Sequence, residues 1–226
     1  MILNDPILIA SAPRSGSSMT AGILDTAGVF TGITKRGDEY NRKGYYENLI
    51  IDEVLGEYLK SCDKDNQGKK FQPLDIDEKF HDFRDLILDL IESEGPTSED
   101  WLVKSTKTAI CRHIWRANFP SAKWVICRRE RQLVVESMMR TPFMNAYDDE
   151  DNWNQMLNRY EYYFRDLIDR CDAHEFNVDA AVNGSTEEIG RLLDYCEIDY
   201  SPVAAQSFID RRLIRAKNKV SGLRSL

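Results

Sequence analysis

The sequence lacks the features that mark several specialised classes of protein. Its five cysteines are scattered, odd in number and without a CxxC pair, so we expect reduced, buried thiols and no disulfide framework. No apolar run approaches the roughly 18–20 residues that cross a bilayer. The opening stretch MILNDPILIASAPR carries Asp5 and no basic leader, so we expect neither a signal peptide nor a membrane anchor. These absences predict a cytoplasmic protein.

Basic charge is also in short supply. The chain of 226 residues has 38 acidic residues against 30 Lys and Arg, which gives a formal net charge of −8. Because nonspecific nucleic-acid binding depends on a basic surface, we expect no nucleic-acid partner. A few local cations can still hold a small anionic ligand. The three histidines, His81, His113 and His174, lie in unrelated segments without ligand spacing, so we expect no metal site.

The order of apolar segments predicts the fold class. Short apolar runs at Ile7–Ala10, 101–103 and 122–127 are typical of buried strands. Helical periodicity or helix-start signals mark residues 19–27, 46–59, 80–91, 108–117, 131–140, 152–171, 185–195 and a last segment from about 202. This alternation predicts a single α/β domain over residues 1–226, with a P-loop-like core and a central parallel sheet of four to five strands flanked by helices.

Residues 13–19, PRSGSSM, follow the first predicted strand and open the first predicted helix. Backbone N–H groups converge at such a helix start, and the helix dipole adds about half a positive charge. Gly16 lets the backbone approach a ligand oxygen closely, while Ser17 and Ser18 supply hydroxyl donors and Arg14 a permanent cation. The segment therefore predicts an oxyanion site.

The loop has two other interpretations. Ser15 or Ser17 can serve simply as a helix cap that satisfies free N–H groups. A Walker A loop requires GxxxxGK[ST], and this loop has neither the first glycine at that spacing nor the lysine, so an ordinary ATPase or kinase fits poorly.

A second candidate anion site follows the strand at 122–127. Arg129 stands at the end of that strand, and Ser137 follows eight residues later in a predicted helix. Helical side chains lean toward the helix N-terminus, so the serine can meet the arginine, and the two can grip one phosphate. The alternative is that Arg128, Arg129 and Arg131 form a solvated basic turn.

Together the two segments resemble the motifs of sulfotransferases. APRSGSSM is similar to the family's 5′-phosphosulfate loop, P-[KR]-S-G-[ST]-[ST]. The string RERQLVVES, which begins at Arg129, is similar to the 3′-phosphate motif R-x-P-x-D-x-x-x-S, with Arg131 and Leu133 in place of the proline and aspartate. The motifs occur in the family's order, and the resemblance covers roughly residues 5–200.

The resemblance implies a sulfuryl donor and residues that bind it. The donor would be 3′-phosphoadenosine 5′-phosphosulfate (PAPS), and the acceptor a small molecule or carbohydrate with a hydroxyl or amine. The implied donor-binding residues are Arg14, Ser15, Gly16, Ser17, Ser18 and Met19 at the 5′-phosphosulfate, with Arg129 and Ser137 at the 3′-phosphate.

It also implies three catalytic residues. Arg14 and Lys104 match the cations that stabilise the leaving phosphate and the sulfuryl group. Residues 41–48, NRKGYYEN, resemble the N-x-K-G-[YF]-[YF]-E-N segment of bacterial members, which makes Glu47 the candidate base. Asp38 and Glu39 compete for that role. Lys104 can alternatively be a surface lysine at a strand end, and Glu47 a carboxylate at a helix N-terminus.

The resemblance favours the bacterial or carbohydrate-type branch, because Thr106 stands where cytosolic small-molecule enzymes have a histidine. Two rival functions stay open: an atypical P-loop kinase, and a non-catalytic protein that binds nucleotide. Candidates to line an acceptor cleft are Tyr45, Tyr46, Phe143, Tyr147 and Trp153. The basic residues Arg211, Arg212, Arg215, Lys217 and Lys219 are a weaker candidate for the 3′-phosphate.

Overall fold

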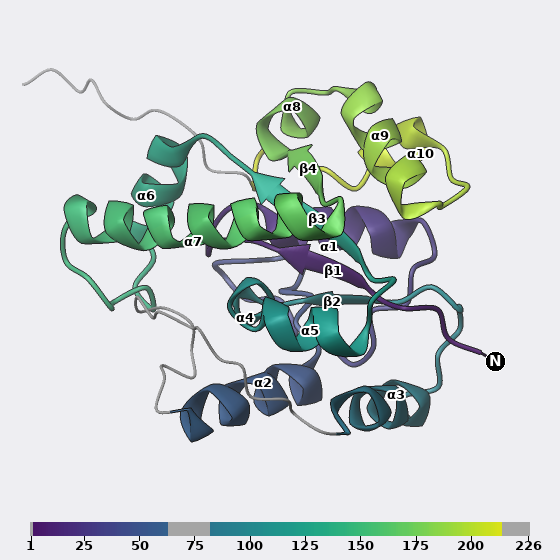
Figure 1. The fold of residues 1–226 in the computed structure, drawn as a ribbon. Coiled ribbons are helices and arrows are strands. Elements are labelled where there is room, and N and C mark those ends of the chain that lie inside the picture. Colours follow the sequence, from purple (N-terminus) through teal and green to yellow (C-terminus); the bar gives the residue numbers. More distant parts are fainter. Residues whose placement is uncertain (1, 63–81, 214–226) are drawn as a thin grey trace, which may run out of the picture.

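A parallel sheet of four strands forms the centre of the molecule. The computed structural model describes residues 2–62 and 82–213. The strands are β1 (Ile7–Ala10), β2 (Leu102–Lys104), β3 (Lys123–Arg128) and β4 (His174–Asn177). They lie in the order β2-β1-β3-β4, and every neighbouring pair is parallel (Figure 1). The predicted fold class is confirmed, with four strands.

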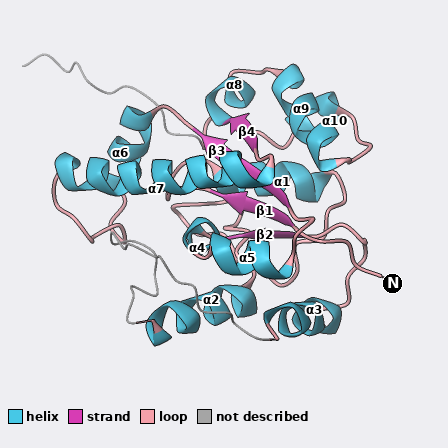
Figure 2. Ribbon diagram, viewed as in Figure 1, coloured by secondary structure: helices cyan, strands magenta, loops and turns pink. Residues whose placement is uncertain are grey.

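The alternation of apolar side chains along β1 explains why helices cover both faces of the sheet. Ile7 and Ile9 point into one core, and Leu8 and Ala10 into the other. The first core is covered by α1 (Ser17–Thr26), α8 (Val178–Val182), α9 (Thr186–Cys196) and α10 (Pro202–Gln206). The second is covered by α2 (Leu49–Ser61), α3 (Phe83–Ser93), α4 (Thr106–Ile110), α5 (Arg112–Asn118), α6 (Arg131–Met139) and α7 (Glu150–Cys171) (Figure 2).

Local side-chain caps set several helix boundaries. The helix predicted to start at residue 46 begins at Leu49, because the Asn48 side chain accepts hydrogen bonds from the backbone N–H groups of Ile50 and Ile51. The helix predicted over 108–117 is two helices that meet at Cys111. The first difference arises from a side-chain hydrogen bond that hydrophobic periodicity does not report.

Ser185 and Glu188 at the start of α9 have the sequence spacing of a capping box, which forms only in part. Ser185 accepts a hydrogen bond from the Glu188 backbone N–H at 3.2 Å. The Glu188 carboxylate does not return to the cap; it accepts from the backbone N–H of Asn177 at 2.6 Å. This side chain therefore ties α9 to the end of β4.

Strand β4 and helix α8 were missed by the sequence prediction. In the strand sequence HEFN only Phe176 is buried, because β4 is the edge strand of the sheet. Helix α8 has five residues, too few for a periodic pattern, and Asn177 caps it by accepting from the Ala180 N–H at 3.0 Å. Both elements contribute to the site described below.

The described residues bear on the expectations about the cysteines and about membrane-spanning segments. All five cysteines are free thiols, and three of them are buried. Over residues 2–62 and 82–213, no helix is both long enough and apolar enough to span a membrane. Residues 61–76 have few apolar positions, which predicts a loop, and they lie almost wholly outside the described residues.

Candidate functional site

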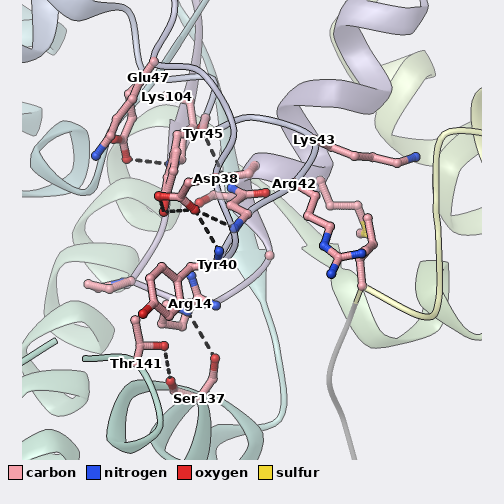
Figure 3. Close-up of a pocket in the computed structure, with 18 of the residues that line it drawn as sticks. Arg14, Asp38, Tyr40, Arg42, Lys43, Tyr45, Glu47, Lys104, Ser137 and Thr141 are labelled. Atoms are coloured by element: carbon pink, nitrogen blue, oxygen red, sulfur yellow. Dashed lines mark hydrogen bonds and ion pairs between the residues drawn. The ribbon is translucent and has the colours of Figure 1, made fainter. Parts of the chain in front are cut away.

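A pocket of about 940 Å³ opens where β1, β2 and β3 end. Its walls are the loop that follows β1, the segment 35–47, the start of α4, the α6 helix and residues 208–213 (Figure 3). Nine basic and five acidic side chains line it, although the chain as a whole carries a net charge of −8. The pocket is therefore a local concentration of positive charge and is suited to an anionic ligand.

The loop after β1 turns sharply into α1. Arg14 and Gly16 both have left-handed backbone conformations, with φ of 65° and 88°. Gly16 is the N-cap of α1 and offers no side chain to its free N–H groups. Ser17 and Ser18 line the pocket, and the Ser18 hydroxyl also donates to the Tyr45 carbonyl at 3.1 Å. Met19 lines the pocket as well.

Ser15 does not take the place that the motif predicts for its side chain. Its hydroxyl donates to the Ala12 carbonyl at 2.6 Å, and its backbone N–H bonds the same oxygen at 3.4 Å. The residue is 3% exposed and is absent from the pocket lining. The Ser15 side chain therefore closes the turn of the loop and is not available to a ligand in the pocket.

The two predicted anion sites meet at Arg14. Its Nε donates to the Ser137 hydroxyl at 3.1 Å (Figure 3). Its carbonyl accepts a hydrogen bond from Nη1 of Arg129 at 3.0 Å. Burial lowers the pKa of the Arg14 guanidinium, and nearby Arg129 and Arg140 lower it further, whereas Tyr45 and Asp38 raise it. An arginine still remains charged at neutral pH. Both predicted anion sites thus lie in one pocket.

The adjacent arginines 128 and 129 have different surroundings. Arg128 turns away from the pocket and pairs with Glu161 at 2.7 Å and with Glu175. Arg129 is 7% exposed and lines the pocket. Burial lowers the pKa of Arg129, and Asp179 partly offsets this. The solvated-turn interpretation is therefore wrong for Arg129.

Lys104 and Glu47, predicted from segments far apart in the sequence, form an ion pair. Nζ of Lys104 lies 2.7 Å from Oε1 of Glu47, and the two side chains are 4% and 22% exposed. The interpretation of Lys104 as a surface lysine is therefore wrong. Glu47 immediately precedes Asn48, the cap of α2, so it also lies at a helix N-terminus. A carboxylate and a cation therefore lie together at one end of the pocket.

Asp38, the competing carboxylate, is already saturated with hydrogen-bond donors. The Tyr45 hydroxyl donates to its two oxygens at 2.9 and 2.8 Å, and the N–H groups of Tyr40 and Asn41 donate to Oδ1. Desolvation raises the pKa of Asp38, but these hydrogen bonds outweigh it and hold the pKa below the ordinary value. The geometry therefore favours Glu47 over Asp38 as a proton acceptor.

Sequence reasoning missed a second buried lysine pair beside the first. Nζ of Lys107 lies 2.6 Å from Oδ2 of Asp52, and the Ser105 hydroxyl donates to the other carboxylate oxygen at 2.7 Å. Lys107 and Asp52 both line the pocket. The signal in the sequence was this second lysine, three residues after Lys104. Lys107 lies on the first turn of the short helix α4.

The remaining predicted residues divide between the pocket and the core. Tyr45 and Phe143 line the pocket, whereas Tyr46, Tyr147 and Trp153 pack in the hydrophobic clusters. Arg212 lines the pocket, Arg211 does not, and Arg215, Lys217 and Lys219 lie outside the described residues, as does His81. Within the described part of the chain, no cluster of His, Cys, Asp and Glu could hold a metal ion.

Gly16 provides a test of the loop geometry. A Cβ at this position would lie 2.5 Å from Cγ1 of Val178, and the residue has φ of 88°. We expect Gly16→Ala to lower the free energy of unfolding by about 2–5 kcal/mol, from left-handed strain and overpacking together. Gly28→Ala is the matched control, because Gly28 has φ of 95° with nothing within 4 Å of the added Cβ.

Urea unfolding of both variants measures the two contributions. The control isolates the backbone strain, expected at about 1–2 kcal/mol. Equal losses in the two variants would show that the contact between Gly16 and Val178 does not constrain the loop.

Comparisons with known proteins bear on the family and the fold. A family model described as the sulfotransferase family matches residues 6–202. No curated protein shows a significant match to the sequence. Among solved structures, the sulfotransferase domain from the curacin biosynthetic pathway is similar at 16% identity and a TM-score of 0.57, over 90% of this chain and 77% of that one.

Two other solved structures share the fold. The sulfotransferase domain of the Synechococcus PCC 7002 olefin synthase has 14% identity and a TM-score of 0.56, over 98% of this chain and 91% of that one. Sulfotransferase STF9 from Mycobacterium avium has 11% identity and a TM-score of 0.56, over 91% of this chain and 67% of that one.

Proposed function

Because the chain belongs to the sulfotransferase family, we propose that it transfers a sulfuryl group from PAPS to a hydroxyl or amine of a small-molecule or carbohydrate acceptor. The observation that carries the proposal is the convergence of two anion-binding segments and a lysine–carboxylate pair on one pocket. The cytoplasmic location and the acceptor class stay predictions from the sequence.

The donor is a polyanion, and the residues of the pocket fit it. The loop of Gly16, Ser17 and Ser18 at the start of α1 supplies N–H and hydroxyl donors for the 5′-phosphosulfate. Arg129 and Ser137 supply a buried cation and a hydroxyl for the 3′-phosphate. The surplus of basic side chains in the lining provides the compensating charge.

In the proposed reaction the acceptor oxygen or nitrogen forms a bond to sulfur while the bond from sulfur to the 5′-phosphate oxygen breaks. Glu47 accepts the proton of the attacking group, and 3′-phosphoadenosine 5′-phosphate leaves with the bonding electrons. Lys104 stabilises charge on the transferring group, and Arg14 stabilises charge on the leaving phosphate. As in phosphoryl transfer, positioning and electrostatic stabilisation supply most of the catalysis.

The donor assignment predicts a preference for a 3′-phosphate that depends on Arg129. Calorimetry should show tighter binding of 3′-phosphoadenosine 5′-phosphate than of adenosine 5′-phosphate or ATP with Mg²⁺. Arg129→Ala should weaken binding of the bisphosphate by about 10–150-fold, because a charge-assisted hydrogen bond contributes about 1.5–3 kcal/mol. Binding of adenosine 5′-phosphate should change by less than about threefold.

Arg128→Ala is the matched control, since it removes the adjacent arginine, whose partners Glu161 and Glu175 are outside the pocket. It should leave the preference for the 3′-phosphate intact. If the unmodified protein binds the bisphosphate no more tightly than adenosine 5′-phosphate, the donor assignment is wrong. Tight binding of ATP with Mg²⁺ would favour a kinase. Tight bisphosphate binding without turnover of any acceptor would favour a non-catalytic nucleotide-binding protein.

A further inference from the structure

Arg129 is held by few groups for a buried cation. One of its terminal nitrogens donates to the Arg14 carbonyl at 3.0 Å. Its Nε lies 3.5 Å from Oδ1 of Asp179, an ion-pair distance, and has no hydrogen-bond partner in the described part of the chain. The guanidinium therefore has N–H donors that can bind an anion. The groups that fix its orientation determine where those donors point.

Asp179 contacts the two residues that follow β3, Arg129 and Glu130. Its Oδ2 accepts a hydrogen bond from the backbone N–H of Glu130 at 2.7 Å, while its Oδ1 faces Nε of Arg129. One carboxylate therefore fixes the backbone of the turn into α6 and lies against the guanidinium. This turn lacks the proline and aspartate of the motif that it resembles, so a residue distant in the sequence constrains it instead.

The carboxylate is itself held on a supported element. Asp179 lies in the first turn of α8, which Asn177 caps. The backbone N–H of Asn177 is bonded by Glu188 of α9, and Val178 packs against Gly16 in the loop after β1. Helix α8 therefore contacts both anion-binding segments, one through Val178 and the other through Asp179.

We propose that Asp179 is a positioning residue for recognition of the donor's 3′-phosphate, which it serves by orienting Arg129 and the Glu130 backbone. This role rests on the proposed donor. By charge alone a carboxylate beside a phosphate site opposes anion binding. A favourable effect of Asp179 on affinity can therefore arise only from geometry. Removal of Asp179 should weaken bisphosphate binding if the residue positions Arg129, and should tighten it if the residue acts only through its charge.

The test compares two variants of Asp179 by calorimetry with 3′-phosphoadenosine 5′-phosphate and adenosine 5′-phosphate. Asp179→Ala should lower the ratio of the two affinities about tenfold, the effect of one well-placed hydrogen bond to a charged group. Asp179→Asn keeps an acceptor for the Glu130 N–H and removes the charge, so it should keep the ratio within about threefold of the parent value. Glu161→Ala, which removes one of the two carboxylate partners of Arg128, should leave the ratio unchanged.

Each other outcome overturns the role. An unchanged ratio in Asp179→Ala would mean that Asp179 has no part in recognition of the 3′-phosphate, and tighter bisphosphate binding in both variants would mean that it acts only as a repelling charge. A loss in Asp179→Asn as large as in Asp179→Ala would exclude positioning through the retained acceptor. Binding of adenosine 5′-phosphate confirms that each variant is folded, and a parent protein without preference for the 3′-phosphate would instead refute the proposed donor.

Discussion

Replacing Lys104 with methionine is expected to slow sulfuryl transfer about 10²–10³-fold, the usual cost of removing one preorganised group that stabilises transition-state charge. The side chain is 4% exposed and its ammonium stands at the end of the pocket beside Glu47. Methionine keeps most of the volume and removes the charge. The rate is measured as formation of 3′-phosphoadenosine 5′-phosphate from PAPS. The sulfuryl group is transferred either to water or to an acceptor found by screening.

Lys107→Met is the matched control for this result. It breaks the neighbouring buried pair with Asp52 in the same wall of the pocket. If both variants lose rate equally, the loss comes from broken ion pairs and not from contact with the reacting group. Urea unfolding of Lys104→Met and of the double variant Lys104→Met with Glu47→Gln shows whether the unpaired Glu47 carboxylate destabilises the single variant.

Glu47→Gln is expected to lower the rate about 10²–10⁴-fold, the range for loss of a positioned general base. The amide keeps the shape of the side chain and a carbonyl that can still accept from Lys104, so donor binding should change little. Turnover of PAPS measures the rate, and calorimetry with 3′-phosphoadenosine 5′-phosphate measures donor binding.

Asp38→Asn distinguishes the two carboxylates. Because Tyr45 and two backbone N–H groups already donate to Asp38, its replacement should alter the segment 35–47 and lower the rate much less than Glu47→Gln does. A larger loss of rate in Asp38→Asn than in Glu47→Gln would assign the base to Asp38 instead. Calorimetry with the bisphosphate shows whether either change has reached the donor site.

The sequence was most informative where a motif and an element boundary coincide. The loop around Gly16 is rich in serine, contains a glycine and an arginine, and follows a continuous apolar strand. Both its place and its connection to α1 were therefore predictable. Arg129 and Lys104 follow strands in the same way, and parallel strands bring their carboxyl ends to one edge of a sheet. The juxtaposition of these segments therefore followed from the fold class.

The parts that were not predictable depend on contacts between distant segments. An edge strand with one buried residue and a helix of five residues carry little periodic signal, so β4 and α8 were missed, and Asp179 with them. The inward turn of Ser15 is set by a single hydrogen bond to Ala12, which a motif string does not encode. The pairing of Lys107 with Asp52 likewise depends on how α2 packs against α4.

The central position of β1 has a consequence for how the chain acquires its structure. The first strand pairs with β2 and β3, whose residues begin near positions 102 and 123, so it has no sheet partner until more than a hundred residues are available. Such sequence-distant pairing is associated with slow folding. The loop around Gly16 must wait longer still, because Val178 belongs to α8. A chain released before that helix is synthesised would contain the phosphate-loop sequence without the packing that shapes it.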